Sequence, residues 1–294
     1  MPQAELEDCI SSSFFINISR AFTIVLFCSI AASADDNVAT IIQRSVEANN
    51  RDWDAAPQFD YSERDQGPDG SKTYAVSMLY GSPYRRLVAV DGKGLSAEKV
   101  AEEQKKFEKV LSERRDESPE KKSARIAKYE AERKRDHTML EQLTAAFDFK
   151  LQGEQNFKGR RVYVLKATPR KDYRPPNRDS QVLTGMEGRL WIDKATFQWV
   201  RVEAHVTHPV RIEGFLAEVE PGTQFELDKI PVSPDIWLAS HFAMKSDAKV
   251  MLLFRHRSQE DDTFFNYHKP TGATQERQSG SASSKTDAAG SNRM

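Results

Sequence analysis

Two kinds of residue in this chain have side chains that could hold a metal or act on a substrate, and the histidines come first. His205 and His208 are its closest pair of histidines. Imidazole nitrogens are common metal ligands, but this spacing on a strand places the two rings on opposite faces unless the chain bends near Pro209. We therefore interpret both, together with His241 and His256, as solvent-facing or hydrogen-bonded side chains.

Asp193 is the second candidate, because a carboxylate at the end of an apolar run can serve as a general acid or base. It can equally accept backbone hydrogen bonds in a turn over residues 193–196, which is the usual role of aspartate at such a position. The motifs of serine hydrolases, zinc proteases, phosphate-binding loops and EF-hands are missing from the sequence. We favour the turn interpretation, and we expect no catalytic residue, no metal and no cofactor.

A basic loop between Pro169 and Ser180 offers binding chemistry. Its cations are Arg170, Lys171, Arg174 and Arg178. Such a loop is usually only solvated, but guanidinium groups can also contact a phosphate headgroup or an acidic patch of a partner at the rim of a cavity.

The composition argues against two classes of function. The formal net charge is -1, whereas nucleic-acid binders usually carry a basic excess on one face. The only cysteines are Cys9 and Cys28. A chain that loses its first 34 residues therefore has no thiolate for catalysis, metal binding or disulfides.

The N-terminus has the pattern of an export signal. The apolar run Ala21–Ile30 follows Arg20, and Ala32-Ser33-Ala34 has the small residues that signal peptidase requires. The run is shorter than the ~20 residues that a membrane-spanning helix needs. We predict a signal peptide over 1–34, cleaved after Ala34, a periplasmic location and no integral membrane span in the mature chain. An uncleaved anchor is the alternative.

The leader departs from the usual pattern of a signal in its charge, and it contains a cysteine. Glu5, Glu7 and Asp8 stand where a signal normally has basic residues, which a start codon placed too far upstream would explain. Cys28 follows the bulky Phe27, whereas a lipoprotein signal has a small residue there. We therefore expect Cys28 to remain unmodified.

The remaining chain divides by composition into a body, 35–270, and a tail, 271–294. The tail contains no large apolar residue except its terminal Met294, so we expect it to be disordered. In the body, apolar periodicity predicts one helix over 36–53. Turn residues and alternation predict strands over 59–64, 72–80, 84–90, 150–154, 160–168, 222–230, 236–245, 249–257 and 264–267.

The segment 96–143 is dense in charge and predicts two helices. Ser118-Pro119 marks their boundary, with serine as N-cap and proline in the first turn. The sparse apolar positions favour a solvated helical hairpin laid on a sheet. A coiled coil with a partner is the alternative, although no steady heptad is present.

The stretch from Gly188 to Glu203 predicts a hairpin. Leu190 and Ile192 alternate with polar or aromatic neighbours, and Val200 and Val202 do so after the turn. Its Gly-x-Leu-Trp-Ile-Asp sequence, the turn and the closing Arg-x-Glu resemble a hairpin of the outer-membrane lipoprotein carrier family. The strand 162–169 (Val-Tyr-Val-Leu-Lys-Ala-Thr-Pro) resembles the family more weakly.

The order of predicted helices and strands indicates an α+β fold, a strongly curved antiparallel sheet with helices against one face. The resemblance makes this more specific: it implies an incomplete barrel with helices packed on its concave face. It also implies an apolar cavity that accepts acyl chains. The strand residues that could line such a cavity, or equally form a closed core, are Leu190, Ile192, Val200, Val202, Leu252 and Phe254. The charged segment 96–143 is longer than in the compact carriers, which argues against transferring their docking surfaces to this chain.

Two functions follow as hypotheses. The first is a non-enzymatic periplasmic protein that buries an acyl chain of a lipid or lipoprotein. The second is an envelope sensor or scaffold that binds another protein through the same fold, with the charged helices as docking surface. An exported hydrolase with an unrecognised site is a more distant third.

Export gives a direct prediction: the mature chain begins at Asp35 and carries no acyl group. Intact-mass measurement of the protein from a Gram-negative host checks both points. A chain that starts at Met1, or a mass increase that maps to Cys28, would contradict the prediction.

Overall fold

A computed structural model describes residues 37–212, 217–250 and 254–270, all of which belong to one unit that begins at Asp36. The predicted signal peptide, the cleavage site and the tail lie outside these residues and remain predictions. None of the helices in the described ranges combines the length and the apolar character that crossing a bilayer requires.

Helix α1 (Val38–Ala55) forms where apolar periodicity predicts it. Asn37 caps its first turn, since the Asn37 side chain accepts a hydrogen bond from the Ala39 N–H at 3.0 Å. Its buried side chains lie three or four positions apart and include Ile41 and Ile42. A 3-10 turn, η1 (Ala56–Gln58), contains Pro57 and ends the helix.

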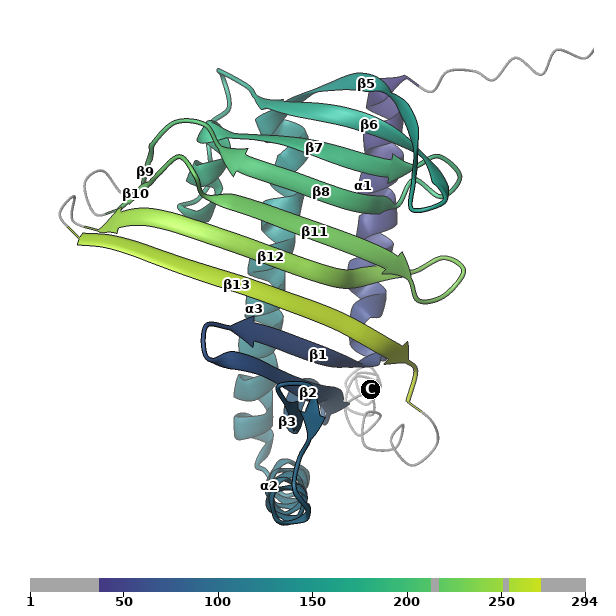
Figure 1. Ribbon diagram of the computed structural model, residues 1–294, viewed down its shortest axis with the longest axis vertical. Helices are drawn as coiled ribbons and strands as arrows, with labels where there is room; N and C mark the ends of the chain where they lie inside the picture. Colours follow the sequence, from purple (N-terminus) through teal and green to yellow (C-terminus); the bar gives the residue numbers. More distant parts are fainter. Residues whose placement is uncertain (1–36, 213–216, 251–253, 271–294) are drawn as a thin grey trace, which may run out of the picture. The chain divides into compact units, whose positions relative to one another are not determined.

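One antiparallel sheet contains every described strand (Figure 1). Its strands are β1 (Asp60–Gly67), β2 (Gly70–Leu79), β3 (Ser82–Val90), β4 (Lys93–Gly94), β5 (Phe147–Phe157), β6 (Arg160–Pro169), β7 (Met186–Asp193), β8 (Trp199–Val206), β9 (Val210–Ile212), β10 (Ala217–Val219), β11 (Gln224–Pro231), β12 (Trp237–Val250) and β13 (Phe254–His268). Their order is β4-β3-β2-β1-β13-β12-β11-β8-β7-β6-β5, with the β9–β10 hairpin attached to β12. The pairing of β1 with β13 joins the first and last strands of the described chain. The sheet does not close into a barrel within the described residues, because its path ends at β4 and β5.

The predicted α+β class is therefore confirmed, with one correction at the end of the sheet. Ile236–Lys245 and Lys249–Arg257 were expected as separate strands. Instead β12 continues to Val250 and pairs with β13 from His241↔Thr263 to Val250↔Phe254. Charged residues such as Lys245 do not interrupt a strand, because alternate side chains of an antiparallel strand can face water.

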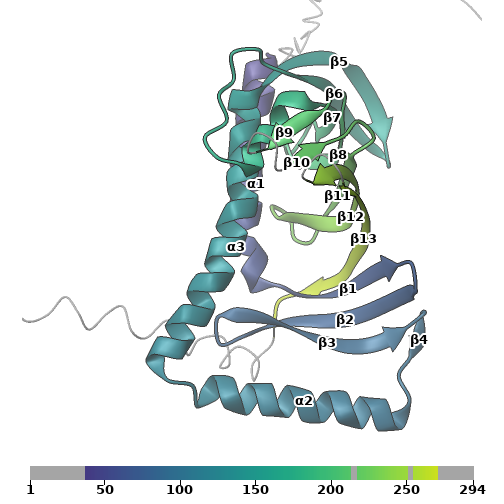
Figure 2. The ribbon, with the colours of Figure 1, turned by 90° about the vertical axis from the view of Figure 1, so that its left-hand side faces the viewer.

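The charged segment forms α2 (Ala97–Arg115) and α3 (Pro119–Ala146), which meet at the predicted boundary. Ser118 caps α3 by accepting a hydrogen bond from the Lys121 N–H, and Pro119 occupies the first turn. The prediction of a helical hairpin is wrong. Helix α2 packs against β3, whereas α3 runs beside α1. The two helices α2 and α3 lie at a steep angle to each other (Figure 2). Phe107 of α2 packs against Tyr84 of β3, with ring centroids 5.7 Å apart. Helix α2 thus packs on the sheet through its own apolar contact instead of pairing with α3.

Two arginines of these helices hold the β2–β3 turn. Arg114 donates to the carbonyls of Leu79 at 3.0 Å and Ser82 at 2.9 Å. Arg125 donates to the Tyr80 carbonyl at 3.1 Å and to the Ser82 hydroxyl at 2.6 Å. Charge in this segment therefore satisfies backbone acceptors of the turn rather than only facing solvent.

The main core lies between the sheet and the two helices α1 and α3. It contains Ile41 and Ile42 of α1, Ala146 at the end of α3, and inward residues of β5 to β8. Helices α1 and α3 cover the same face of the sheet (Figure 2). Covering this apolar face supplies most of the stabilisation expected for such an arrangement.

A buried ion pair connects the C-terminal half of α1 to the sheet. The Lys229 ammonium of β11 donates to the Asp52 carboxylate at 2.5 Å and to the Asn49 side-chain oxygen at 2.8 Å. Asp52 also accepts from the Trp237 N–H at 2.9 Å and from the Gln198 amide at 3.0 Å. Burial lowers the pKa of Lys229, and the charge of Asp52 opposes that shift.

We expect Asp52→Ala to lower the free energy of unfolding by about 3–5 kcal/mol, because it leaves the Lys229 ammonium buried without its anion. Urea unfolding measures the change. The double variant Asp52→Leu/Lys229→Met removes both charges and should lose less than Asp52→Ala alone. A larger loss in the double variant would contradict this account of the pair.

Candidate functional site

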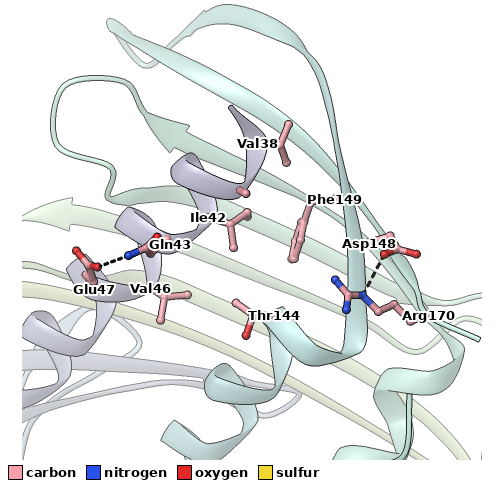
Figure 3. A pocket seen from close by; sticks show the side chains of 10 residues that line it. Val38, Ile42, Gln43, Val46, Glu47, Thr144, Asp148, Phe149 and Arg170 are labelled. Carbon is pink, nitrogen blue, oxygen red and sulfur yellow. Dashed lines mark hydrogen bonds and ion pairs between the residues drawn. The ribbon is translucent and has the colours of Figure 1, made fainter. Parts of the chain in front are cut away.

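A pocket of about 620 Å³ opens between the first turns of α1 and the start of β5. Its apolar wall consists of Val38, Ala39, Ile42, Val46 and Phe149. Its polar lining consists of Gln43, Glu47, Thr144, Asp148 and Arg170. Figure 3 shows Val38 and Ile42 of α1 facing Phe149 across the space. The volume is in the range of sites for small molecules.

Local periodicity positions this wall. Val38, Ile42 and Val46 are four residues apart and form one row along α1. On β5, alternation directs Phe147 and Phe149 towards the helices, and Phe147 is buried in the main core whereas Phe149 is only half-buried. The row on α1 therefore extends beyond the core to the end of the sheet, where the pocket begins.

Arg170 provides the cation at the rim. Its Nε donates to the Phe147 carbonyl at 3.2 Å and lies 3.0 Å from a carboxylate oxygen of Asp148. The Asp148 side chain is 71% exposed, so this ion pair is in contact with solvent and is weak. The guanidinium keeps further N–H donors that an anionic group at the rim could use.

Of the predicted basic residues, Arg170 alone is among the described residues that line this pocket. Lys171, Arg174 and Arg178 are exposed on the following loop. The Arg174 guanidinium donates to the Tyr173 carbonyl at 3.2 Å. Arg178 precedes a 3-10 helix, η2 (Asp179–Gly185), that was not anticipated in this loop.

Three of the predicted apolar residues are in the main core beneath α1. Leu190, Ile192 and Val202 are buried there, and none of them is among the residues lining the pocket. Leu252 lies outside the described residues. Phe254 begins β13, but its side chain also falls outside what the structure describes.

Val200 was predicted to share a face with Leu190, Ile192 and Val202, but it lies on the opposite face of the sheet. Leu190 pairs with Val202 and Trp191 with Arg201, but Ile192 pairs with Trp199, which leaves Val200 as an extra residue. This β-bulge shifts the alternation. Val200 therefore packs with Trp191 and Trp237 in a second cluster on the opposite face of the sheet.

The interpretation of Asp193 as a turn residue is confirmed. One carboxylate oxygen accepts from the N–H groups of Ala195 at 3.0 Å and Thr196 at 2.9 Å. The side chain is buried, and its other oxygen lies 3.4 Å from Arg160. Both carboxylate oxygens of Asp193 therefore have partners within the chain, and the side chain stabilises the turn.

The histidines also follow the expectation where their side chains are described. His205 and His208 are exposed, and the His241 ring lies 3.1 Å from the Asp261 carboxylate. The side chain of His256 lies outside the described residues.

Sequence reasoning missed an acidic cluster at the seam between β1 and β13. Carboxylate oxygens of Glu63, Asp65 and Asp262 lie within 4.8 Å of one another, and Asp65 stands directly opposite Asp262. Three carboxylates this close together could bind a cation. Arg85 already contacts two of them, Glu63 at 3.1 Å and Asp65 at 2.7 Å, so we assign no metal to the cluster. No local signal indicates this cluster, because only the pairing of β1 with β13 brings the acids together.

The acidic cluster makes stability depend on pH. Burial, reinforced by Glu260 and Asp65, raises the pKa of Asp262 to about 7. An unfolded aspartate has a pKa of about 3.9. Between these values the folded state binds more protons, so the Asp262 contribution is complete below about pH 4 and is lost as the pH rises through about 7.

We therefore expect Asp262→Asn to reduce the decline in unfolding free energy between about pH 4 and 7. Urea unfolding of both proteins across this interval tests the point. Asp69→Asn, in the β1–β2 turn, is the control and should leave the decline unchanged. Equal slopes for Asp262→Asn and the wild type would refute the assignment.

No protein-family model matches the chain, and no curated protein sequence matches it. Among solved structures, an outer membrane lipoprotein-sorting protein domain from Vibrio parahaemolyticus has 12% identity and a TM-score of 0.31, covering 79% of this chain and 94% of that one. A LolA superfamily protein from Nitrosomonas europaea has 10% identity and a TM-score of 0.31, covering 81% and 95%. MucB in complex with MucA(peri) has 13% identity and a TM-score of 0.24, covering 82% and 96%. The chain is thus similar, at low identity and low TM-score, to structures of the lipoprotein-sorting and LolA superfamily type.

Proposed function

We propose that this protein is a non-enzymatic periplasmic binding protein that holds an acyl chain of a lipid or lipoprotein in the pocket between α1 and β5. The observation that carries the proposal is the row of Val38, Ile42 and Val46 facing Phe149 across about 620 Å³, with a cation at the rim. An acyl chain matches such a wall because it has no polar group to satisfy. Its affinity comes from apolar surface leaving water, at about 25 cal/mol per Å².

The position of Arg170 at the pocket mouth favours a ligand with an anionic headgroup. Its partner Asp148 is largely exposed, so exchange of this carboxylate for a phosphate or carboxylate of the ligand costs little. A guanidinium binds such groups through two parallel N–H donors. The acyl chain and the headgroup would then occupy adjacent parts of one site.

Movement of α1 is the proposed route to a deeper cavity on the concave face of the sheet. The polar anchor of α1 is Asp52, near its C-terminal end, whereas Ile41 and Ile42 near the other end make apolar contacts with the core. The N-terminal half can therefore lift without breaking the ion pair with Lys229. Such a movement would expose Leu190, Ile192 and Val202, the residues that the sequence suggested as cavity wall. Val200 faces away and is not part of this proposal.

A second candidate function is docking of another envelope protein on α2. This helix has no fully buried residue, and Val100 on it is 52% exposed. An exposed, strongly charged helix with an isolated apolar residue fits a scaffold or sensor role. It would be preferred if the folded protein takes up no acyl ligand.

The pocket is tested by two substitutions at neighbouring positions of α1. Ala39 lines the pocket, whereas Thr40 is exposed and does not. We expect Ala39→Trp to weaken binding of a fluorescent fatty acid about tenfold, which is about 1.4 kcal/mol, because the indole occupies the site. Thr40→Trp should bind normally.

Urea unfolding accompanies the titration, and both variants should change the unfolding free energy by less than about 0.5 kcal/mol because both sites are at the surface. Equal binding by the two variants would reject this pocket as the site. Absence of saturable binding by the wild type would reject the acyl function and favour docking on α2.

The headgroup is tested with Arg170→Gln and with Lys171→Gln as the matched control, since Lys171 lies outside the pocket. Arg170→Gln should weaken binding of a fatty acid a few-fold, but should leave a monoacylglycerol of the same chain length unaffected, because only the former carries an anion. Competition against the fluorescent probe measures both ligands. An equal loss for the two ligands would show that Arg170 acts on the fold of the pocket rather than on the headgroup.

A further inference from the structure

The turn between β7 and β8 holds a bulky residue in an unusual backbone conformation. Phe197 has a φ of +60°, in the left-handed region that glycine and asparagine adopt much more readily. Its N–H donates to the Asp193 carbonyl at 2.9 Å and so closes the turn. A phenylalanine at this position indicates that contacts of its ring offset the cost of the backbone conformation.

The Phe197 ring contacts both the sheet and helix α1. It is buried and belongs to the main core. The ring of Tyr163 on β6 flanks it, with centroids 6.4 Å apart. From the side of α1, the guanidinium carbon of Arg44 lies 3.5 Å from the centroid of the Phe197 ring, which is a cation–π contact.

Arg44 lies on the flank of α1 that faces away from the pocket. Ser45 is buried on the inward face of the helix, and neighbouring residues of a helix are about 100° apart. Arg44 and Val46 therefore lie on opposite flanks of that face, and Val46 lines the pocket. Among the described residues, no hydrogen bond or ion pair involves the Arg44 side chain, so the Phe197 ring is the group that positions its guanidinium.

The two halves of α1 are held by contacts of different kinds. The buried pair of Asp52 and Lys229 fixes the C-terminal half. The N-terminal half has apolar contacts with the core and the contact of Arg44 with Phe197. Breaking this cation–π contact leaves no buried charge, because residue 44 is exposed and its guanidinium can turn into water. It can therefore open and close while the ion pair remains intact.

We propose that Arg44 and Phe197 form a latch that holds the N-terminal half of α1 on the sheet and limits how often this half lifts. Separation of the helix from the sheet separates the guanidinium from the ring, so the latch stabilises only the closed state. The inference rests on the α1 movement of the proposed function and adds the residues that restrain it.

Labelling of a buried thiol measures the lifting. Ser45→Cys replaces only an oxygen by sulfur, and the thiol reacts with a small reagent only when this part of α1 leaves the sheet. We expect Arg44→Gln to raise the labelling rate about fivefold, which is about 1 kcal/mol. Cys9 and Cys28 both precede Asp35, so the experiment uses protein whose mass shows that they have been removed, or a variant with both changed to serine.

Two controls separate lifting from other effects. Val200 lies in the second cluster, on the opposite face of the sheet, so the thiol of Val200→Cys reports unfolding of the whole domain. Its labelling rate should be the same with and without Arg44→Gln. Arg51 is exposed on the same flank of α1 two turns later, and Arg51→Gln should leave labelling at position 45 unchanged.

Phe197→Leu tests the other half of the latch. Leucine keeps an apolar side chain in the core but has no aromatic face for the guanidinium. It should raise labelling at position 45 relative to position 200. Arg44→Gln should then add little, because the two substitutions break the same contact. Effects of the two substitutions that simply multiply would overturn the latch.

Unchanged labelling at position 45 in Arg44→Gln would also overturn the proposal. An equal rise at positions 45 and 200, or an equal effect of Arg51→Gln, would do the same. These measurements need no ligand. A thiol that responds in a protein without acyl binding would therefore support the latch and reject the proposed function, whereas acyl binding with an unresponsive thiol would reject only the latch.

Discussion

The buried pair of Asp52 and Lys229 is the constraint on which the placement of α1 depends. A charge in this interior is tolerated only with its partner and with hydrogen bonds to the remaining atoms. Asp52 receives the Lys229 ammonium, the Trp237 N–H and the Gln198 amide together. These donors come from β11, from the start of β12 and from the residue before β8. One carboxylate therefore sets both the rotation of α1 and its position along three strands.

The location of the pocket follows from this asymmetry in α1. The C-terminal half of the helix is held by directional polar contacts, whereas Val38, Ile42 and Val46 in the other half make only apolar ones. Apolar contact is not directional, and the row continues past the point where the core is closed. At that point Phe149 is half-buried and the space between helix and sheet is open. The proposed acyl site at this end would require no residue with unusual chemistry, because an acyl chain is held by apolar contact alone.

The charged helices show how a segment that looks solvated can be structural. Arg114 and Arg125 bind the carbonyls of the β2–β3 turn, and Arg133 of α3 donates to the Trp53 carbonyl at 2.6 Å. The Trp53 ring also stacks on His137, with centroids 4.3 Å apart. Arginine serves this purpose because its planar group offers several donors on a long apolar stem. The composition of the segment shows that it is highly charged, but it does not show which backbone carbonyl each arginine binds.

Features of this chain that depend on near neighbours could be predicted from the sequence. Apolar spacing placed α1, the Ser118-Pro119 pair placed the boundary of α2 and α3, and Asp193 indicated its own turn, because caps and turns involve residues only a few positions apart. Three other features could be read only from the folded chain: the face on which Val200 lies, the pairing of β1 with β13 and the burial of Lys229. A bulge depends on the strand opposite, and the partner of Lys229 is Asp52, 177 positions away. The pocket belongs to this second class: Arg170 was named from its charge, but the wall of α1 beside it lies there because core contacts of Ile41 and Ile42 and the distant pair of Asp52 with Lys229 together place that helix.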